Sequence, residues 1–323
     1  MPGRILDVAV GVLVRQDGCV LLDQRPADKS WAGWWELPGG KIEAGETVLQ
    51  ALARELQEEL GIKVTRSYPW VTYIHEYPHA TVRLSFCRVE HWEGEPRPEE
   101  RQTLGWFTPR DALELPQLLP AAYPPLRWLQ LPDTYGVTAI GGTDNLAGYL
   151  QRLERALARG LQLVQFREPG WANGGPADAS ALAALQAVRE RCHAAGARIL
   201  VNSVHPQEWW QQADGVHLRA ADARATVTRP ALRPYNLLGV SAHDSVGLAH
   251  ARRLQADFAV LGPVLPTASH PDSPVLEWEG FTRQLADAGL PVYAIGGQSP
   301  DTLETAHHHG AHGIAGISAI IPS

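Results

Sequence analysis

Two different rhythms of apolar and polar residues divide the chain. Before about residue 129, Asp7 to Arg15 and Cys19 to Arg25 alternate on either side of the turn signal Gln16-Asp17-Gly18, which predicts two strands. Further strand-like segments follow at Trp70 to Ile74, Ala80 to Glu90 and Gly105 to Thr108. These segments and the one helix described next predict a small α+β domain.

The helix is predicted from apolar residues at helical spacing. Thr47 with Gln50 has the form of a capping box, in which each side chain satisfies a backbone N–H at the helix start. Gly61 is a typical helix stop. The break before the helix is expected at Pro38-Gly39-Gly40. The apolar stripe consists of Leu49, Leu52, Leu56 and Leu60.

Beyond residue 135, short apolar segments alternate with Ala/Leu-rich helical stretches such as Asn145 to Arg159 and Ser180 to Ala195. This alternation predicts a closed (β/α)8 TIM barrel, with an open doubly wound sheet as the alternative. The expected strands are Gly136 to Ile140, Leu161 to Phe166, Arg198 to Asn202, Gly215 to Leu218, Leu237 to Ser241, Phe258 to Leu261, Pro291 to Ile295 and Gly313 to Ile317.

A proline-rich stretch, Leu115 to Pro132, separates the two patterns and is expected to be a packed connector. The predicted architecture is therefore an α+β domain over residues 1–130, with a mixed sheet between helices, followed by a TIM barrel over residues 131–323. A chain of 323 residues is long enough for two such cores.

Charge and cysteine content narrow the range of partners. The formal net charge is −7 and basic residues are not clustered, which argues against duplex nucleic acid as a partner. A single nucleotide remains compatible, because a bound metal supplies positive charge for its phosphates. The three cysteines are far apart, and neither a signal pattern nor a membrane-length apolar run is evident. We expect a cytoplasmic protein that acts on small molecules, with no membrane partner.

Three glutamates on the predicted helix are the strongest chemical signal. Glu55, Glu58 and Glu59 are spaced so that their carboxylates share one face, where they repel one another. A hard divalent cation such as Mg²⁺ or Mn²⁺ relieves this repulsion and in turn binds phosphates. Arg54 is placed to pair with Glu58 or to orient Glu55. Three such glutamates alone are also compatible with an ordinary solvated helix face.

The full spacing from Gly40 to Ile62 resembles the Nudix box, G-x5-E-x7-R-E-U-x-E-E-x-G-U with U aliphatic. Residues 7 to 109 are similar to the MutT branch, whose members hydrolyse oxidised guanine nucleoside triphosphates. The supporting segments are Ala9-Val10-Gly11, Gln24-Arg25-Pro26-Ala27-Asp28, Trp35 to Lys41 and Trp92 to Pro96.

The resemblance implies a metal held by glutamates and one backbone carbonyl. Glu55 is the candidate for orienting or deprotonating the attacking water, with Lys41 stabilising charge on the leaving phosphate and Arg54 assisting. Arg25, Gly40 and Tyr123 are candidate substrate contacts. The implied metal ligands are Gly39, Glu55, Glu58, Glu59 and Glu100.

The residues that read the base depart from the MutT pattern. The alignment places Ala122 where an asparagine reads the purine edge, and His79 and Ala80 where an acidic-basic pair is found. The phosphate chemistry is therefore expected to be intact, while the identity of the base is open.

Residues 135 to 323 resemble thiamine-phosphate synthase and its TenI-like relatives. The resemblance rests on segments such as Val164 to Arg167, Gly215 to Leu218, Gly239 to His243 and Ala294 to Gly297. The resemblance and the fold together predict phosphate or ligand contacts at Arg167, Asn202, Asp222, Ser241, Thr267, Gly297 and Ser318.

Three positions of the synthase pattern are lost. Lysines are replaced by Pro169 and His270, and an aspartate that binds metal is replaced by Ser203. We therefore expect a barrel that binds a phosphate compound, such as a phosphorylated thiamine-related ligand, or that serves as a scaffold. The histidines His307, His308, His309 and His312 are expected to form a solvated helix end, not a metal site.

The leading functional hypothesis is Mg²⁺-dependent hydrolysis of 8-oxo-dGTP or a similar non-standard nucleotide to a monophosphate and pyrophosphate. A second hypothesis is hydrolysis of a thiamine-related diphosphate, linked to the barrel. A third is a module that only recognises lesions, which three repelling carboxylates argue against. A fourth is a bifunctional enzyme that also makes thiamine phosphate, which Pro169, Ser203 and His270 argue against.

Overall fold

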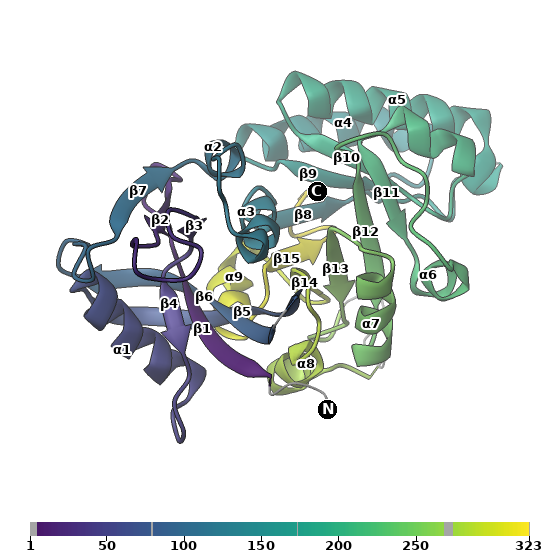
Figure 1. Ribbon diagram of the computed structural model, residues 1–323. Helices are drawn as coiled ribbons and strands as arrows, with labels where there is room; N and C mark the ends of the chain where they lie inside the picture. The colour runs from purple at the N-terminus through teal and green to yellow at the C-terminus, as the bar shows by residue number, and fades with distance from the viewer. Residues whose placement is uncertain (1–4, 79, 173, 268–273, 323) are drawn as a thin grey trace. The chain divides into compact units, whose positions relative to one another are not determined.

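The chain folds as two compact units, Met1–Leu131 and Pro132–Ser323 (Figure 1). The computed structural model describes residues 5–78, 80–172, 174–267 and 274–322. The positions of His79 and His270, singled out in the sequence, lie outside the described residues. Each unit is described by itself below.

The first unit contains two small sheets. In the larger one, of order β4-β1-β6-β5, strand β1 runs parallel to β6 and the other pairs are antiparallel. The smaller sheet has the order β3-β2-β7 and is antiparallel. The strands are β1 (Leu6–Leu13), β2 (Val20–Gln24), β3 (Trp35–Glu36), β4 (Gly39–Lys41), β5 (Lys63–Tyr77), β6 (Ala80–Glu93) and β7 (Thr103–Phe107).

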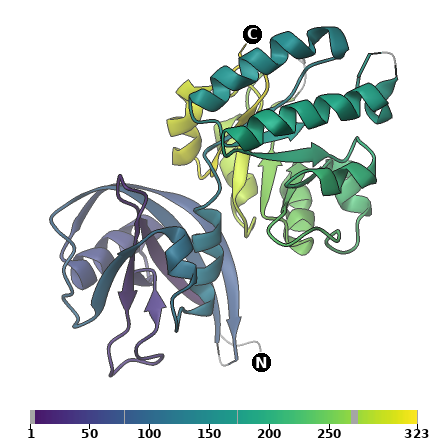
Figure 2. The same ribbon diagram turned by 90° about the horizontal axis from the view of Figure 1, so that it is seen from above.

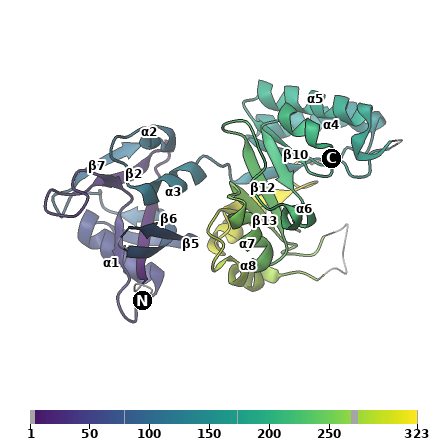
Figure 3. The ribbon, with the colours of Figure 1, turned by 45° about the vertical axis from the view of Figure 1, so that its right-hand side comes forward.

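Helices cover both faces of the larger sheet, as Figure 3 shows for α1 (Val48–Leu60) and α3 (Tyr123–Trp128). The leucines of α1 pack with Ala9 and Leu13, while Leu126 and Trp128 of α3 pack with Val10 and Val12 on the other face. Neighbouring residues of β1 thus enter different cores, as strand alternation requires. The predicted α+β domain with a mixed sheet between helices is confirmed.

Helix α1 begins and ends where the sequence indicated. The Thr47 and Gln50 capping box is present, and Gly61 ends the helix in the left-handed conformation at φ 66°. Residues Gly39–Lys41, expected only as a chain break, instead pair with β1 as strand β4. This pairing places the glycine loop directly beside the helix that carries the glutamates.

The proline-rich stretch is part of the first unit and not only a connector. Pro120 begins a short 3-10 turn (Pro120–Ala122), and Pro124 and Pro125 lie in the first turn of α3. Proline is tolerated there because the first N–H groups of a helix have no partner within the helix. Leu126 is fully buried, so the stretch contributes to the core. A second short helix, α2 (Pro109–Leu113), precedes it.

The second unit is a closed barrel of eight parallel strands, which confirms the predicted fold class. The ends of each strand differ by no more than a few residues from the predicted ends. The strands are β8 (Thr134–Val137), β9 (Leu163–Phe166), β10 (Arg198–Asn202), β11 (Gly215–Leu218), β12 (Leu237–Ala242), β13 (Phe258–Leu261), β14 (Val292–Ile295) and β15 (Gly313–Gly316).

Helices surround the barrel strands, and the two long helices α4 and α5 lie side by side on the outside (Figures 1 and 2). Their apolar residues join the strands in one core that includes Leu153, Leu185 and Val188. The helices are α4 (Thr143–Ala158), α5 (Ala179–Ala194), α6 (Ala220–Ala225), α7 (Ser245–Arg253), α8 (Glu277–Leu285) and α9 (Leu303–His308).

The histidines near α9 correct one prediction. His307 and His312 are 8% and 0% exposed, so they do not belong to a solvated helix end. The His307 ring lies 3.2 Å from the carbonyl oxygen of His312, which gives it a polar partner inside the barrel wall. Among the described residues, no helix is long and apolar enough to cross a membrane.

Candidate functional site

The glycine loop of β4 and the acidic face of α1 form the centre of the candidate site. The backbone N–H of Gly39 donates to Glu59 Oε2 over 3.1 Å. At Gly40, a Cβ atom would stand 2.2 Å from the carboxyl group of Glu55, so only glycine leaves room for this carboxylate. The predicted carboxylates Glu55 and Glu59 therefore both lie against the Gly39-Gly40 backbone.

Arg54 orients the other acidic groups through its guanidinium fork. It donates to Glu46 over 2.8 and 2.9 Å, to Glu55 over 2.8 Å and to Glu58 over 3.3 Å. It also donates to the carbonyl oxygen of Lys41 over 3.0 Å, which ties β4 to α1. Both pairings expected for Arg54 are present, and Glu46 is an additional partner.

Glu100 approaches this site from the loop after β6. Its carboxylate pairs with Lys29, a cation that the sequence analysis did not single out. The Gln102 side chain accepts from the backbone N–H of Glu100 over 2.8 Å and donates to the carbonyl oxygen of Glu59 over 2.7 Å. Gln102 therefore fastens the Glu100 loop to the C-terminal end of α1.

The acidic groups have shifted pKa values. Burial, together with the charges of Glu36, Glu55 and Glu100, raises the pKa of Glu59 to about 7, although the Gly39 N–H opposes this shift. In contrast, hydrogen bonds from Arg54 lower the pKa of Glu46 to about 2. The site thus holds more carboxylates than nearby cations, so an added positive charge would be favoured.

The donor set fits a divalent metal of the hard type. The groups around the Gly39-Gly40 loop are carboxylate and carbonyl oxygens, which Mg²⁺ and Mn²⁺ prefer. In the conformation described here, no group of three acidic, histidine or cysteine side chains among the described residues is gathered for a metal. Glu55 and Glu58 share Arg54, and Glu100 pairs with Lys29, so these cations hold the prospective ligands.

An apolar pocket adjoins Gly39 on the face of the sheet opposite α1. It has one ionisable carboxylate, that of Glu36, which accepts from Arg25 over 2.6 Å. Ala122, which stands where the MutT pattern has its base-reading asparagine, lines the pocket, whereas Tyr123 is 41% exposed and does not. The lining residues are Val8, Val10, Glu36, Leu37, Gly39, Tyr77, Leu84, Phe86, Leu119, Ala121 and Ala122.

Sequence reasoning missed Glu36 and Tyr77 as lining residues of this pocket. No local sequence pattern marks Glu36, because its position opposite Asp23 depends on the pairing of β2 with β3. Burial, followed by the charge of Glu36, raises the pKa of Asp23, which is only 6% exposed. Burial raises the pKa of Glu36 as well, while Arg25 lowers it.

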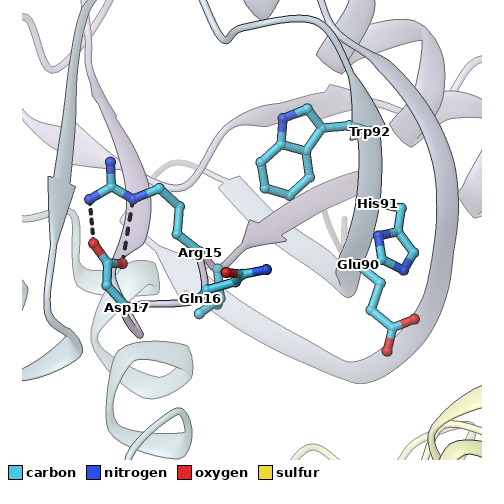
Figure 4. Close-up of a pocket in the computed structure, with 7 residues that line it drawn as sticks. Arg15, Gln16, Asp17, Glu90, His91 and Trp92 are labelled. Atoms are coloured by element: carbon cyan, nitrogen blue, oxygen red, sulfur yellow. Dashed lines mark hydrogen bonds and ion pairs between the residues drawn. The ribbon is translucent and has the colours of Figure 1, made fainter.

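A second hollow in the first unit lies away from this chemistry. Its volume is about 580 Å³, and it opens at the ends of β1 and β6 (Figure 4). Arg15 there pairs with Asp17 over 2.7 Å and lies over the ring of Trp106. Although it is larger than the apolar pocket, its charged groups are paired and none of the predicted site residues lines it. We assign the site to the glycine loop.

In the barrel, the predicted ligand contacts lie at or after the C-terminal ends of the strands. Asn202 donates to Gln165 over 2.6 Å, and Ser241 lies 2.9 Å from His217 Nε2. The other nitrogen of His217 lies 3.2 Å from the Tyr135 hydroxyl, so these residues form one buried polar chain. The remaining predicted residues follow strands, with Arg167 after β9, Asp222 in α6, Thr267 after β13, Gly297 after β14 and Ser318 after β15.

The environment of His217 keeps its ring neutral. Burial, followed by the charge of Arg167, lowers the pKa of His217 to about 3.

Glu168, next to Arg167, is buried and accepts from the hydroxyl of Thr138 over 2.5 Å and from the N–H of Gly141 over 2.9 Å. Glu168 thus shapes the loop that presents Arg167, a role that the sequence did not reveal.

Asp222 stands where the synthase pattern has an aspartate of the metal-binding type, but its carboxylate is not free for a metal. Its carboxylate accepts from the Ser203 hydroxyl over 2.6 Å and from Arg219 over 2.6 and 3.1 Å. Ser203 stands where the synthase pattern has a metal-binding aspartate. The position that the synthase pattern gives to two metal-binding aspartates thus holds one carboxylate, paired with the guanidinium of Arg219.

Comparisons with known proteins agree with this division of the chain. Residues 9–123 match the NUDIX domain family, and residues 134–320 match the family described as thiamine monophosphate synthase. The 8-oxo-dGTP diphosphatase of Proteus vulgaris is 43% identical over 95 residues, which cover 29% of this chain and 85% of that protein.

Two further relatives match the chain, one in each unit. The CTP pyrophosphohydrolase of Escherichia coli (strain K12) is 40% identical over 115 residues, covering 36% of this chain and 84% of that protein. The thiamine-phosphate synthase of Bacillus velezensis is 32% identical over 193 residues, covering 59% of this chain and 85% of that protein.

The class of protein follows from these matches and from the site. The chain belongs to the Nudix hydrolase family through its first unit and to the thiamine monophosphate synthase family through its second. It is therefore a Nudix hydrolase, an enzyme that acts on phosphoric anhydride bonds, with a synthase-like barrel.

Proposed function

We propose that the first unit is a Mg²⁺- or Mn²⁺-dependent nucleoside triphosphate pyrophosphohydrolase that acts on 8-oxo-dGTP or a similar non-standard nucleotide. The products are a nucleoside monophosphate and pyrophosphate. The observation that carries the proposal is the approach of Glu55 and Glu59 to the Gly39-Gly40 backbone beside an apolar pocket. The activities named for the Proteus and Escherichia relatives support the same reaction class.

The proposed roles follow from the positions of the side chains. Glu55, Glu58, Glu59, Glu100 and the carbonyl of Gly39 would hold the metal. When bound, the cation neutralises phosphate oxygens and so makes phosphorus easier to attack. Glu55 orients the attacking water or accepts a proton from it. Arg54 positions the Glu55 carboxylate through a hydrogen bond. Lys41, at the end of β4, neutralises charge on the leaving phosphate.

The pocket next to Gly39 is the place proposed for the base. Its walls suit a flat apolar ring, and the carboxylate of Glu36 supplies hydrogen-bond acceptors. The edge of guanine presents two adjacent N–H donors, N1–H and N2–H, that one ionised carboxylate accepts together. Cytosine presents a lone pair next to its N–H, so it requires a protonated Glu36. The contact with Arg25 opposes the burial that raises the pKa of Glu36, and it is the ionised form that would select guanine.

A second candidate is hydrolysis of a thiamine-related diphosphate. The observation that favours it is the membership of residues 134–320 in the thiamine monophosphate synthase family. The first unit would then act on a diphosphate whose product or precursor binds the barrel.

The test is a parallel assay with Mg²⁺ of 8-oxo-dGTP, dGTP, dCTP and thiamine diphosphate, with pyrophosphate and monophosphate followed separately. We expect 8-oxo-dGTP to be cleaved best and Glu59→Gln to reduce the rate about 10³-fold or more. Glu95→Gln, an exposed carboxylate outside the site, is the matched control. Preferred cleavage of dCTP would overturn the assignment of the base, and preferred cleavage of thiamine diphosphate would favour the second candidate.

Turnover that does not respond to Mg²⁺ or to Glu59→Gln would show that the glycine loop is not the active site. Turnover of none of the four substrates at any Mg²⁺ concentration would refute the proposed substrate class.

A further inference from the structure

The mouth of the barrel is where the synthase resemblance implies a divalent cation, and the residues present do not fit one. Of the two acids of that pattern, Asp222 is retained and the other is Ser203, whose hydroxyl has no charge to offer a metal. Both oxygens of Asp222 already accept from Arg219. No cluster of three acidic, histidine or cysteine side chains occurs there among residues 132–172, 174–267 and 274–322.

Arg219 supplies at this place the positive charge that a metal would supply. It directly follows β11, and its backbone N–H donates to the Ser203 hydroxyl over 2.9 Å. Its guanidinium and the Ser203 hydroxyl share the Asp222 carboxylate. Backbone, hydroxyl and carboxylate thus all hold this one cation in position.

The pairing leaves capacity for a ligand. A guanidinium has five N–H donors, and the bidentate contact with Asp222 uses two of them, at Nε and Nη2. Five minus two leaves three donors for the oxygens of an anion. The Arg219 side chain is 47% exposed, so these donors are accessible.

Other groups at the same end of the barrel suit an anion. Arg167 is exposed directly after β9, at the same end of the barrel as Arg219, which directly follows β11. Of the acids at this end, Asp222 is neutralised by Arg219. Glu168 is buried and accepts from Thr138 and from the N–H of Gly141. The mouth therefore combines two guanidinium groups with two carboxylates that already have hydrogen-bond partners.

We propose that Arg219 replaces the divalent cation in this barrel, so that the barrel binds a phosphate or diphosphate group of a small molecule without a metal. This inference concerns the second unit and does not depend on the substrate of the first. It also separates this barrel from the metal-dependent chemistry implied by its resemblance to the synthase.

The first experiment measures pyrophosphate binding by calorimetry. The full chain carries Glu55→Gln and Glu59→Gln, so that the metal site of the first unit is disabled. We expect pyrophosphate to bind in the presence of EDTA and Arg219→Gln to weaken that binding at least about tenfold. Arg219→Lys should recover part of the loss, because it restores the charge but not the fork. Arg224→Gln, an exposed arginine of α6, is the control and should have no effect.

Two outcomes would overturn the proposal. One is pyrophosphate binding that appears only when Mg²⁺ is added. The other is no binding under either condition, which would remove the anion site altogether.

A second experiment counts Mn²⁺ ions by electron paramagnetic resonance in the same disabled protein. We expect Asp222→Asn to leave Mn²⁺ binding unchanged, and Ser203→Asp with Arg219→Gly to create one new site that Asp222→Asn removes again. A Mn²⁺ ion already bound before this repair and lost in Asp222→Asn would refute the replacement. That arm remains decisive even if the repaired variant does not fold.

Discussion

Each unit carries acidic side chains at its candidate site, and the two sites differ in how nearby cations balance that negative charge. Around the Gly39-Gly40 loop, Arg54 and Lys29 are shared among a larger set of glutamates, so negative charge remains in excess. At the mouth of the barrel, Asp222 is matched by Arg219. The site at the Gly39-Gly40 loop therefore favours an added positive charge, whereas at the barrel mouth Arg219 already supplies one.

The comparison teaches that membership of a metal-dependent family does not by itself establish a metal site. Excess negative charge at a site favours a bound cation, because the repulsion between carboxylates is relieved by an added positive charge or by a proton. Burial raises the pKa of Glu59 to about 7, whereas at Asp222 the hydrogen bonds from Arg219 and Ser203 outweigh burial and lower the pKa. The two sites thus differ in the direction of the shift.

Among substitutions that leave every carboxylate in place, the largest effect at the first site is expected from Gly40→Ala. The new methyl group would displace the Glu55 carboxylate, because its Cβ would stand 2.2 Å away. A shift of about 1 Å in a catalytic group costs about 100-fold in rate, so we expect that loss in kcat/KM. The displaced atoms are the flexible end of a side chain, so the melting temperature should change little. Gly148→Ala, in the open on α4, is the control, and unchanged hydrolysis in Gly40→Ala would contradict the geometry.

A smaller effect is expected from Arg54→Lys. Lysine keeps the charge but cannot contact Glu46, Glu55 and the Lys41 carbonyl at once. We expect kcat/KM to fall about tenfold, as for other groups that position metal ligands, and the apparent Mg²⁺ affinity to weaken. Steady-state kinetics over a Mg²⁺ series measures both. An unaltered Mg²⁺ dependence would mean that Arg54 does not position the carboxylates.

The barrel should show its own pH dependence through His217. Its pKa falls from 6.5 to about 3 on folding, first through burial and then through Arg167. The unfolded chain therefore binds the extra proton between these values, and stability decreases as pH falls through that window. The expected contribution is at most about 1.4 kcal/mol per pH unit. Denaturation midpoints from pH 4.5 to 7.5 should show a shallower slope in His217→Gln, and parallel slopes would exclude His217 as the cause.

The smallest effect is expected at the start of α1. Thr47→Ala removes the side chain that caps the N–H of Gln50. Loss of such a cap costs about 1 kcal/mol of unfolding free energy, while hydrolysis should remain within about twofold. Urea unfolding and kinetics on one preparation test both statements. A large loss of activity at full stability would give Thr47 a role in the site that the structure does not assign.

Much of the fold was predictable from local patterns. The capping box and Gly61 bound α1 because capping depends on residues within one turn of each other. The eight barrel strands followed from short apolar runs between helical stretches. The glutamates of α1 were predictable for the same reason, since their spacing on one helix determines which face they share.

Contacts between distant segments were not predictable in this way. Glu36 and Tyr77 reach one pocket from separate strands, and Lys29 meets Glu100 across 71 residues of sequence. His307 and His312 were expected in solvent, but the barrel wall buries them. Each outcome depends on how strands and loops pack, which no local spacing records.

The sequence by itself determined the family of each unit, the helix that carries the glutamates and the order of strands and helices in the barrel. These properties depend on residues that are near one another along the chain. Only the tertiary structure decided that Gly40 leaves room for Glu55 and that Glu36 lines the apolar pocket. It alone also showed that Ser203 and Arg219 both donate hydrogen bonds to the Asp222 carboxylate. The physical reason is that charge balance and free space at a site are set by all the segments that meet there.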